Sequence, residues 1–449
     1  MVTCIDVAVA GGGPAGAFTA RELARAGLSV LLIDPATCRP RLEGLGERVA
    51  QLLIAKGLGE ALGAASEPLP RHVTWAGLTG TANGERLVRR HDFDDALRRA
   101  SFAAGTETRQ ARVSRILKSD RQNGVLLKLS TGEEISARLL IDARGRQASS
   151  AQRLKGPQTL AIAGLTDGPA GPASTHVEAT PQGWLWVAED PDFGRWLQIS
   201  IGADDLPGSG QAALQERMIR FLAQEQLAER FEDLSCSKPL IARPAGLVLA
   251  APRLPLPVIP VGDAAVAIDP LSGHGLFWAL SSALSAVPSV LTIFENPEEG
   301  GQLAARFYRD RVVETFWRQA RTGRDFYRLE TGFSANPFWA ERINWPDDEP
   351  SHPPVAETHL EQRVVVDSNR LVEREVLVTP QDPGGVAYVA GIPVGDLKPF
   401  FPSSVLAQPP PRTPSPALKA AFGWLESRGL LHGSLSCTKQ HQTKTRETA

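Results

Sequence analysis

The sequence predicts an α/β fold with three parts: a dinucleotide-binding domain, an antiparallel sheet inserted into it, and a small C-terminal α+β domain. Three observations support this prediction. A glycine-rich turn follows a hydrophobic strand near the N-terminus, and a second hydrophobic strand ends in an acidic residue. Several strands then follow one another without helices over residues 159–201. A segment rich in proline and acidic residues, 346–354, precedes the last part of the chain.

The first βαβ unit, residues 5–34, carries the fingerprint of a Rossmann-like domain. The glycine turn and the start of its helix read Gly11-Gly12-Gly13-Pro14-Ala15-Gly16. Gly11 permits the tight turn, Gly13 lets the backbone approach a pyrophosphate, and Gly16 lets the helix pack close to the sheet. The helix N-terminus then presents free N–H groups to the phosphates. Asp34 ends the second strand, where its carboxylate accepts hydrogen bonds from a ribose.

Short patterns predict the rest of this domain, which we place at residues 1–155 and 240–345. Helical spacing of apolar residues indicates a helix over 48–62, and a strand leads into a helix over 86–100 that Asp92 or Asp94 caps. Alternation over 109–141 predicts strands that end at a glycine turn. A long helix that carries seven arginines and most of a cluster of aromatic residues is expected over 302–330.

The inserted antiparallel sheet is predicted at residues 156–239 and is expected to form the substrate domain. Its strands lie at 175–179, 184–188 and 196–201, separated by proline, glycine and aspartate turns. A helix over 211–226 follows them.

The small C-terminal domain is predicted at residues 350–435. Short strands precede a final helix that Ser415 caps and Gly429 ends. The polar residues 436–449 are expected to be disordered. We expect this domain to dock a partner peptide, because small-molecule enzymes have less need of such an addition.

Composition limits the class of protein. The chain has 449 residues, a net charge of −2 and four dispersed cysteines, so neither nucleic-acid binding, a disulfide framework nor a metal site is expected. The N-terminus leads directly into the first strand, which favours a cytoplasmic protein. Residues 270–294 contain no charged side chain, yet their glycine, serine and proline residues favour a buried helix over a membrane span.

A second group of motifs points to flavin. One glycine fingerprint alone favours resident FAD, with NAD(P)H as a transient electron donor. Asp263, after the strand that ends at Gly262, is placed to bind a ribityl hydroxyl. The later turn reads Asp269-Pro270-Leu271-Ser272-Gly273-His274-Gly275, and its helix N-terminus would stabilise negative charge on a reduced isoalloxazine. His274 either faces the flavin or simply packs within the protein.

Several motifs together resemble group A flavin monooxygenases and their halogenase-like relatives over residues 3–345. They are GGGPAG, Gly46-Glu47-Arg48, Arg90 with Phe93-Asp94 and Leu97, and VGDAA with DPLSGHG. The resemblance implies an FAD-binding domain of the p-hydroxybenzoate hydroxylase type. It adds Arg48, Arg90 and Pro270 to the cofactor-binding residues.

Two departures argue against halogenation. Halogenases carry Trp-x-Trp-x-Ile-Pro, whereas this chain has Trp184-Leu185-Trp186-Val187-Ala188-Glu189. They also need a lysine beside the flavin, and the first hundred residues contain only Lys56, in a predicted surface helix. Oxygen transfer is therefore favoured over halide chemistry.

The whole chain is similar to flavoprotein monooxygenases that hydroxylate a protein tryptophan during maturation of quinohemoprotein amine dehydrogenase, on the way to cysteine tryptophylquinone. This resemblance implies FAD, O2, a flavin C4a-hydroperoxide, and a small partner polypeptide that carries the target tryptophan. NAD(P)H or a reduced flavin would supply electrons.

Candidate catalytic groups are Glu47 and His274, with Asp142 as another carboxylate in position to act as a base. Each carboxylate has a structural alternative, since Glu47 can pair with Arg48 and Asp142 can hold a turn.

Two other functions stay open at this point. One is an FAD-dependent reductase or cyclase that acts on a small apolar molecule, because Asp142-Ala143-Arg144-Gly145 also resembles carotenoid cyclases. The other is a non-catalytic FAD-bound peptide chaperone. The basic helix at 302–330 fits either a docking face for a peptide or a helix with an aromatic core face and a solvated face.

Overall fold

The computed structural model describes residues 5–37, 40–120, 124–148, 153–168, 170–205, 210–224, 227, 238–401, 411 and 413–431. The chain forms two compact units, Met1–His352 and Pro353–Ala449, each described by itself below. The tail predicted to be disordered, 436–449, lies outside the described residues.

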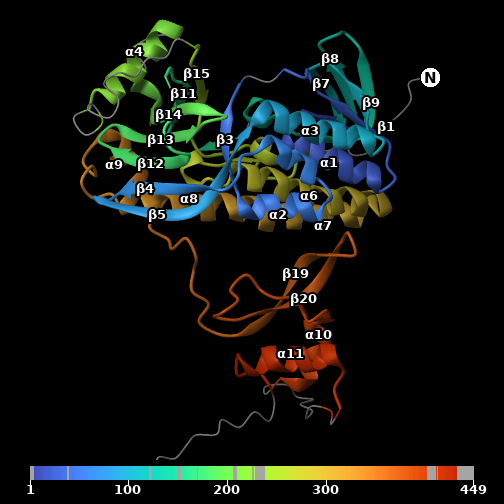
Figure 1. Ribbon diagram of the computed structural model, residues 1–449. Coiled ribbons are helices and arrows are strands. Elements are labelled where there is room, and N and C mark those ends of the chain that lie inside the picture. Colours follow the sequence, from blue (N-terminus) through green and yellow to red (C-terminus); the bar gives the residue numbers. More distant parts are fainter. Residues whose placement is uncertain are drawn as a thin grey trace, which may run out of the picture. The chain divides into compact units, whose positions relative to one another are not determined.

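The first unit contains a seven-stranded, mainly parallel sheet of order β6-β2-β1-β9-β8-β7, with β17 also paired to β9 (Figure 1). Its parallel strands are β1 (Ile5–Ala10), β2 (Val30–Ile33), β6 (Glu107–Arg109), β9 (Glu134–Asp142) and β17 (Val258–Pro260). The strands β7 (Val113–Asp120) and β8 (Gly124–Leu129) pair antiparallel. The central strands are continuous apolar runs because helices and neighbouring segments cover both faces of the sheet.

Four helices of this unit share one apolar core. They are α1 (Pro14–Arg25), α2 (Glu47–Ala55), α3 (Arg90–Ala103) and α6 (Gly275–Glu295). Phe18, Leu53, Phe93 and Leu280 are buried together where these helices meet. Neither Asp92 nor Asp94 caps α3, because Arg89 occupies the N-cap and Asp94 instead binds Arg90.

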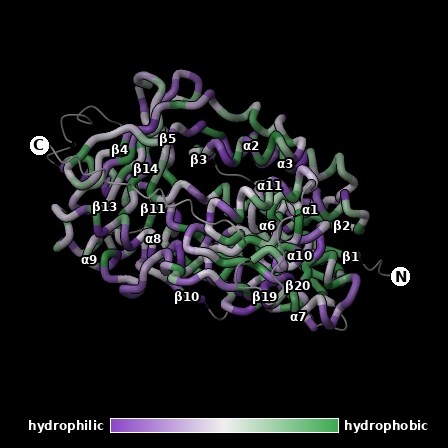
Figure 2. Tube along the Cα trace, turned by 90° about the horizontal axis from the view of Figure 1, so that it is seen from below, coloured by the Kyte–Doolittle hydropathy of each residue, from purple (hydrophilic) through white to green (hydrophobic). Residues whose placement is uncertain are grey.

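Helix α6 is long and apolar enough to cross a membrane by length and composition, and 78% of its most apolar window is buried within the protein. The hydrophobic trace of α6 is visible in Figure 2. Its serine and threonine hydroxyls donate to backbone carbonyls one turn earlier, as from Thr292 to Pro288 at 2.8 Å. The segment 270–294, which has no charged side chain, therefore lies mostly in a buried helix of the protein core.

The helix expected over 302–330 is divided by a π-turn. Helix α7 (Pro297–Tyr308) continues through residues Arg309–Val313 into α8 (Glu314–Arg328), and α9 (Pro337–Ile343) follows. Arg321 and Arg324 bind Asp347, and Arg328 binds Asp348. These arginines are therefore engaged within the first unit, which weakens the interpretation of the helix as a docking face.

The second large element of this unit is an eight-stranded sheet of order β15-β11-β14-β13-β12-β4-β5-β3. Its strands are β3 (Leu42–Gly46), β4 (Leu69–Trp75), β5 (Leu78–Arg89), β11 (Thr159–Leu165), β12 (Ser174–Thr180), β13 (Gly183–Asp190), β14 (Gly194–Gly202) and β15 (Ile241–Pro244). The sheet is larger than the predicted 156–239 insertion, because three of its strands come from residues 42–89. A separate three-stranded sheet is formed by β10 (Leu154–Lys155), β16 (Val248–Leu249) and β18 (Val266–Ala267).

Alternation gives the eight-stranded sheet two different faces. On β13, Leu185 and Val187 pack against α4 (Gln211–Leu222), whereas Trp184 and Trp186 point to the opposite side. In Figure 1, α4 lies above β11, β13 and β14. The tryptophan face is consequently free of this helix.

The second unit is a hairpin with helices. The hairpin pairs β19 (His359–Asp367) with β20 (Arg370–Val378), and the short strands are β21 (Tyr388–Val389) and β22 (Ile392–Pro393). The helices are α10 (Val394–Leu397) and α11 (Pro416–Glu426). Ser415 caps α11 through a bond from the Leu418 N–H, as the sequence predicted. Leu377, Leu397, Phe422 and Leu425 belong to its core.

Candidate flavin and substrate site

A cavity of about 1060 Å³ lies in the first unit. Its wall is formed by the glycine turn after β1, the ends of β9 and β17, the start of α6, and the tryptophan face of the eight-stranded sheet. Ligand cavities commonly have volumes of about 300–1,000 Å³, so this one accepts a large ligand. It joins the carboxyl ends of parallel strands to an antiparallel sheet, which brings a nucleotide site and a second compartment into one space.

The glycine turn has the geometry that the fingerprint predicted. Gly11 has φ of +106°, and a Cβ there would lie 2.4 Å from the Ala143 carbonyl oxygen. A Cβ on Gly16 would lie 1.8 Å from the Gly11 oxygen, so α1 crosses the turn at a distance that only glycine permits. A Cβ on Gly13 would meet nothing within 4 Å, because this residue faces the cavity. Pro14 and Ala15 also line the cavity, whereas Gly16 serves packing.

Asp34 lines the same end of the cavity but is already engaged. One carboxylate oxygen accepts a hydrogen bond from Gly12 N at 2.6 Å, and the other accepts one from Ala36 N at 2.7 Å. Arg98 lies 3.8 Å from Asp34 and donates to the Gly12 carbonyl at 3.2 Å. Asp34 therefore also holds the turn in shape, a role that the ribose prediction did not include.

Gly262 and Asp263 also line the cavity, and Gly262 lies against the start of α1, where its Cβ would be 3.0 Å from that of Ala15. The Gly262 N–H donates to Ser282 Oγ at 2.8 Å, and the Trp278 indole N–H donates to the Gly262 carbonyl at 3.1 Å. Asp263 points toward Arg146, with 3.6 Å between the carboxylate and Nε. Burial raises the pKa of Asp263, while Arg146 acts in the opposite direction. Its carboxylate is a hydrogen-bonding group directed to the cavity.

The start of α6 closes this wall. Asp269 accepts a bond from Leu271 N at 3.0 Å, and Gly273 adopts φ of +65°. Pro270, Gly273 and Gly275 line the cavity. His274 is not among the lining residues and is largely exposed; its partial desolvation and the charges of Arg48 and Arg71 lower its pKa. The turn thus lines the cavity through Pro270, Gly273 and Gly275.

Glu47, Arg48 and Asp142 are not brought to the cavity wall. Glu47 and Arg48 are exposed on α2, and Glu47 accepts a bond from Gln51 at 3.3 Å. Asp142 is buried, and both of its oxygens bind the Arg144 guanidinium, at 2.9 and 2.8 Å. Arg144, not Asp142, reaches the cavity. The role of Glu47 or Asp142 as a base stays a prediction.

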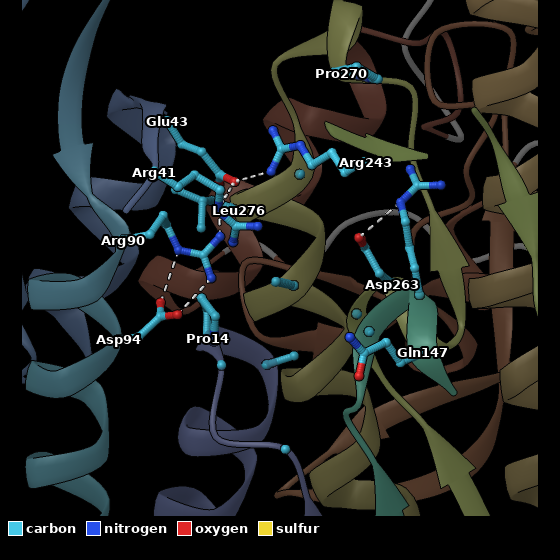
Figure 3. A pocket seen from close by; sticks show the side chains of 18 of the residues that line it. Pro14, Arg41, Glu43, Arg90, Asp94, Gln147, Arg243, Asp263, Pro270 and Leu276 are labelled. Atoms are coloured by element: carbon cyan, nitrogen blue, oxygen red, sulfur yellow. Dashed lines mark hydrogen bonds and ion pairs between the residues drawn. The ribbon is translucent and has the colours of Figure 1, made fainter. Parts of the chain in front are cut away.

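Arg90 belongs to a buried ionic cluster that lines the middle of the cavity (Figure 3). It binds both oxygens of Asp94 at 2.9 Å and Glu43 at 3.0 Å. Arg41 lies 3.0 Å and Arg243 3.4 Å from the same glutamate. Burial alone would raise the pKa of Glu43, but Arg41, Arg90 and Arg243 together hold it far below its usual range. Burial lowers the pKa of Arg41 to about 10.

The part of the cavity beside the eight-stranded sheet, here called the far compartment, is lined by residues that the sequence patterns did not single out as a site. Trp184 and Trp186 on β13 form its aromatic wall, and both are buried. Glu85 on β5 and Arg71 on β4 add a carboxylate and a guanidinium. Alternation along β13 was the available signal for the tryptophans, whereas Glu85 joins them only through the pairing of distant strands.

The described lining fits FAD. Gly13 and the start of α1 offer free N–H groups to the cavity, and Asp263 and the start of α6 line it as well. Arginine side chains outnumber acidic ones along the lining, which suits a pyrophosphate.

Comparisons with known proteins identify relatives of the chain. Residues 6–164 match the family model described as lycopene cyclase protein. The solved structure of the peptidyl tryptophan dihydroxylase QhpG, essential for tryptophylquinone cofactor biogenesis, is 34% identical with a TM-score of 0.81, and the match covers 96% of this chain and 100% of that one.

Two curated relatives are more distant. Tryptophan 2-halogenase of Chondromyces crocatus is 27% identical over 72% of this chain and 68% of its own length. Menaquinone reductase of Mycobacterium tuberculosis is 26% identical over 70% of this chain and 78% of its own. The comparisons together confirm the predicted FAD-binding α/β fold, FAD as the cofactor and a flavin-dependent monooxygenase as the class of enzyme.

Proposed function

Because the chain belongs to the halogenase-like family of flavin-dependent monooxygenases, we propose that it hydroxylates a tryptophan side chain of a small partner polypeptide during biogenesis of a quinone cofactor. The observation that carries this proposal is the likeness to the peptidyl tryptophan dihydroxylase, which extends through both units of the chain. The match to the menaquinone reductase covers less of the chain at lower identity. A polypeptide substrate is therefore favoured over a small apolar molecule.

The residues of the nucleotide end are assigned to cofactor binding. FAD supplies the oxygen-activating chemistry when bound. The backbone at Gly13 and the first turn of α1 would hold its pyrophosphate, and Asp263 would accept a bond from a ribityl hydroxyl. The start of α6 at Gly275 would place its positive dipole end at the ring system.

The walls of the far compartment favour attack on an aromatic ring. Trp184, Trp186, Val177 and Leu271 line this compartment with apolar surface, and the two tryptophans offer flat surfaces to an indole. The lining contains no lysine among the described residues, and Lys56 lies on the surface, 3.7 Å from Glu22. These features suit oxygen transfer without a halide.

The remaining assignments follow from the same proposal. Residues 156–239 contribute to the substrate compartment, and the second unit would dock the partner polypeptide. NAD(P)H or a reduced flavin would supply electrons transiently, and the reaction would take place in the cytoplasm.

The decisive experiment gives the FAD-loaded protein a candidate tryptophan-containing polypeptide, an electron donor and ¹⁸O2, followed by intact mass and fragmentation. We expect labelled oxygen, one or two atoms, on a tryptophan ring, and none when Gly13 is replaced by leucine. Oxygen consumption without a modified polypeptide would contradict the proposal. A stable polypeptide complex with no turnover would instead support the chaperone function.

A further inference from the structure

The far compartment of the cavity has one buried carboxylate among aromatic walls. Glu85 extends from β5 and is only 8% exposed, and it lines the cavity together with Trp184, Trp186 and Gln198. A buried carboxylate is retained in such a place only when hydrogen bonds and a positive charge compensate its lost hydration. The partners of its two oxygens show which of them is committed to the fold.

Both hydrogen bonds of Glu85 end on the same oxygen. Oε1 accepts a bond from the Thr175 hydroxyl at 2.7 Å and one from the Trp186 indole N–H at 3.2 Å. Arg71 Nε also lies nearest to Oε1, at 3.8 Å. Among the described residues, Oε2 receives no hydrogen bond. An ionised carboxylate has about four acceptor sites, so Oε2 keeps its full capacity to accept.

Glu85 Oε2 occupies the place that a side chain at residue 44 would take. A Cβ on Gly44, which also lines the cavity, would lie 2.0 Å from Oε2. Gly44 is not in a left-handed conformation, so the requirement for glycine here is one of space. The second oxygen is thus held beside the cavity wall at a position that any other residue 44 would obstruct.

Arg71 connects this carboxylate to the flavin end. Its Nε faces Glu85, and its Nη1 lies 3.4 Å from where a Cβ on Gly273 would be, at the turn before α6. Glu85 is therefore one arginine side chain away from the turn that we assign to the flavin ring. A substrate group bound at Oε2 would lie in the cavity that the two tryptophans and that turn also line.

We propose that Glu85 is the acceptor that binds the ring N–H of the aromatic substrate and so positions the ring for oxygen transfer. The inference rests on the proposed function, because it takes the cavity to hold an aromatic ring. The Glu85 carboxylate already accepts one indole N–H, that of Trp186, which shows that its surroundings accommodate an indole donor. A hydroxyl formed on the ring would find the same acceptor.

The test compares indole with 1-methylindole, which lacks the N–H but keeps the ring. Each is titrated into the FAD-loaded protein, and binding is followed by the change in flavin absorption. A hydrogen bond to a charged group contributes about 1.5–3 kcal/mol, so wild type should bind indole about tenfold or more tightly than 1-methylindole. Equal affinities, or no binding of indole, would overturn the proposal.

Glu85→Gln is the sharpest variant because it keeps the shape of the side chain. Thr175 and Trp186 both donate to Oε1, so the new amide oxygen must occupy that place. The amide NH2 then replaces Oε2 and meets the substrate N–H as a second donor. We expect the preference for indole to disappear or reverse, with little change in thermal stability. A preference that survives Glu85→Gln would refute the role of Oε2.

A matched control lies in the same sheet. Glu189 on β13 binds Arg195 and does not line the cavity, so Glu189→Gln should leave the preference for indole unchanged. The two proposals can fail separately. If wild type discriminates between the indoles but leaves every polypeptide unmodified, the proposed substrate is wrong and the Glu85 site stands. If the polypeptide is hydroxylated and the discrimination is absent, only the Glu85 site is wrong.

Discussion

Gly13 and Gly16 belong to one motif, yet alanine should affect them in opposite ways. At Gly13 the backbone is extended, with φ of −70°, and a Cβ would meet no neighbour within 4 Å. Alanine is a poorer helix N-cap than glycine, but it also reduces the entropy of the unfolded chain, and each effect is below about 1 kcal/mol. We expect Gly13→Ala to change the free energy of unfolding of the FAD-free protein by less than about 1 kcal/mol.

FAD binding should respond far more strongly to Gly13→Ala. The added methyl group projects into the cavity where the pyrophosphate would lie, in the space that is open in this structure. Overpacking of about 1–3 kcal/mol corresponds to roughly 5- to 150-fold weaker FAD binding. Gly16→Ala should instead lower the stability of the FAD-free protein. Its Cβ would lie 1.8 Å from a backbone oxygen, so α1 would have to move. This variant should lose stability by about 3 kcal/mol and lose FAD as a consequence.

The assay combines thermal unfolding of the FAD-free proteins with titration of FAD by flavin fluorescence. Gly63→Ala is the matched control, since this exposed glycine has no neighbour within 4 Å of an added Cβ and does not line the cavity. It should leave FAD affinity unchanged. Gly13→Ala protein that binds FAD as tightly as wild type would refute the assignment of the pyrophosphate to this turn.

Three further predictions concern the cavity wall. Glu43→Gln should destabilise the FAD-free protein by about 1–2 kcal/mol at neutral pH, because Arg41 and Arg243 lose a charge partner while the buried Arg90 keeps Asp94. The pKa of Glu43 lies below its ordinary value of 4.5, so its contribution is complete above that value and is lost as pH falls. Thermal unfolding of wild type between about pH 5 and pH 3 should show this loss, and the variant should lack it. Gly44→Ala should displace the Glu85 carboxylate and abolish the preference for indole over 1-methylindole in the same titration, which an unchanged preference would contradict. With bromide added to the polypeptide assay, the product should carry oxygen and no bromine, since no lysine is among the described lining residues; a bromine isotope doublet in the mass spectrum would disprove this.

The nucleotide end of the cavity was largely predictable from sequence because its geometry is local. The glycine spacing at 11–16 determines the turn and the helix start, and Gly11 and Gly273 have the positive φ values that such turns require. Asp263 follows its strand directly and needs no distant partner to reach the cavity. The direction of the His274 side chain was not predictable, because the same turn satisfies its backbone whichever way the imidazole points.

The substrate end depends on contacts between segments far apart in the chain. Glu85 reaches Thr175 and Trp186 only because β5, β4, β12 and β13 are neighbours in the sheet. Glu43, Arg90 and Arg243 likewise meet from three separate elements. Arg48 was expected at the flavin from motif resemblance and Glu47 was a candidate base by position, yet both are exposed on α2 and neither is among the lining residues. Periodicity predicts that a residue is on one face of an element, and strand order decides what that face meets.

The two faces of β13 have a consequence for how such an enzyme diversifies. Trp184 and Trp186 face the cavity, while Leu185 and Val187 between them hold α4 in place. Substitutions of the two tryptophans change the shape of the cavity without altering the contact between β13 and α4. Leu185 and Val187 can stay constant while the residues that line the cavity change. The two faces of this one strand therefore separate residues that line the cavity from residues that hold the sheet to its helix.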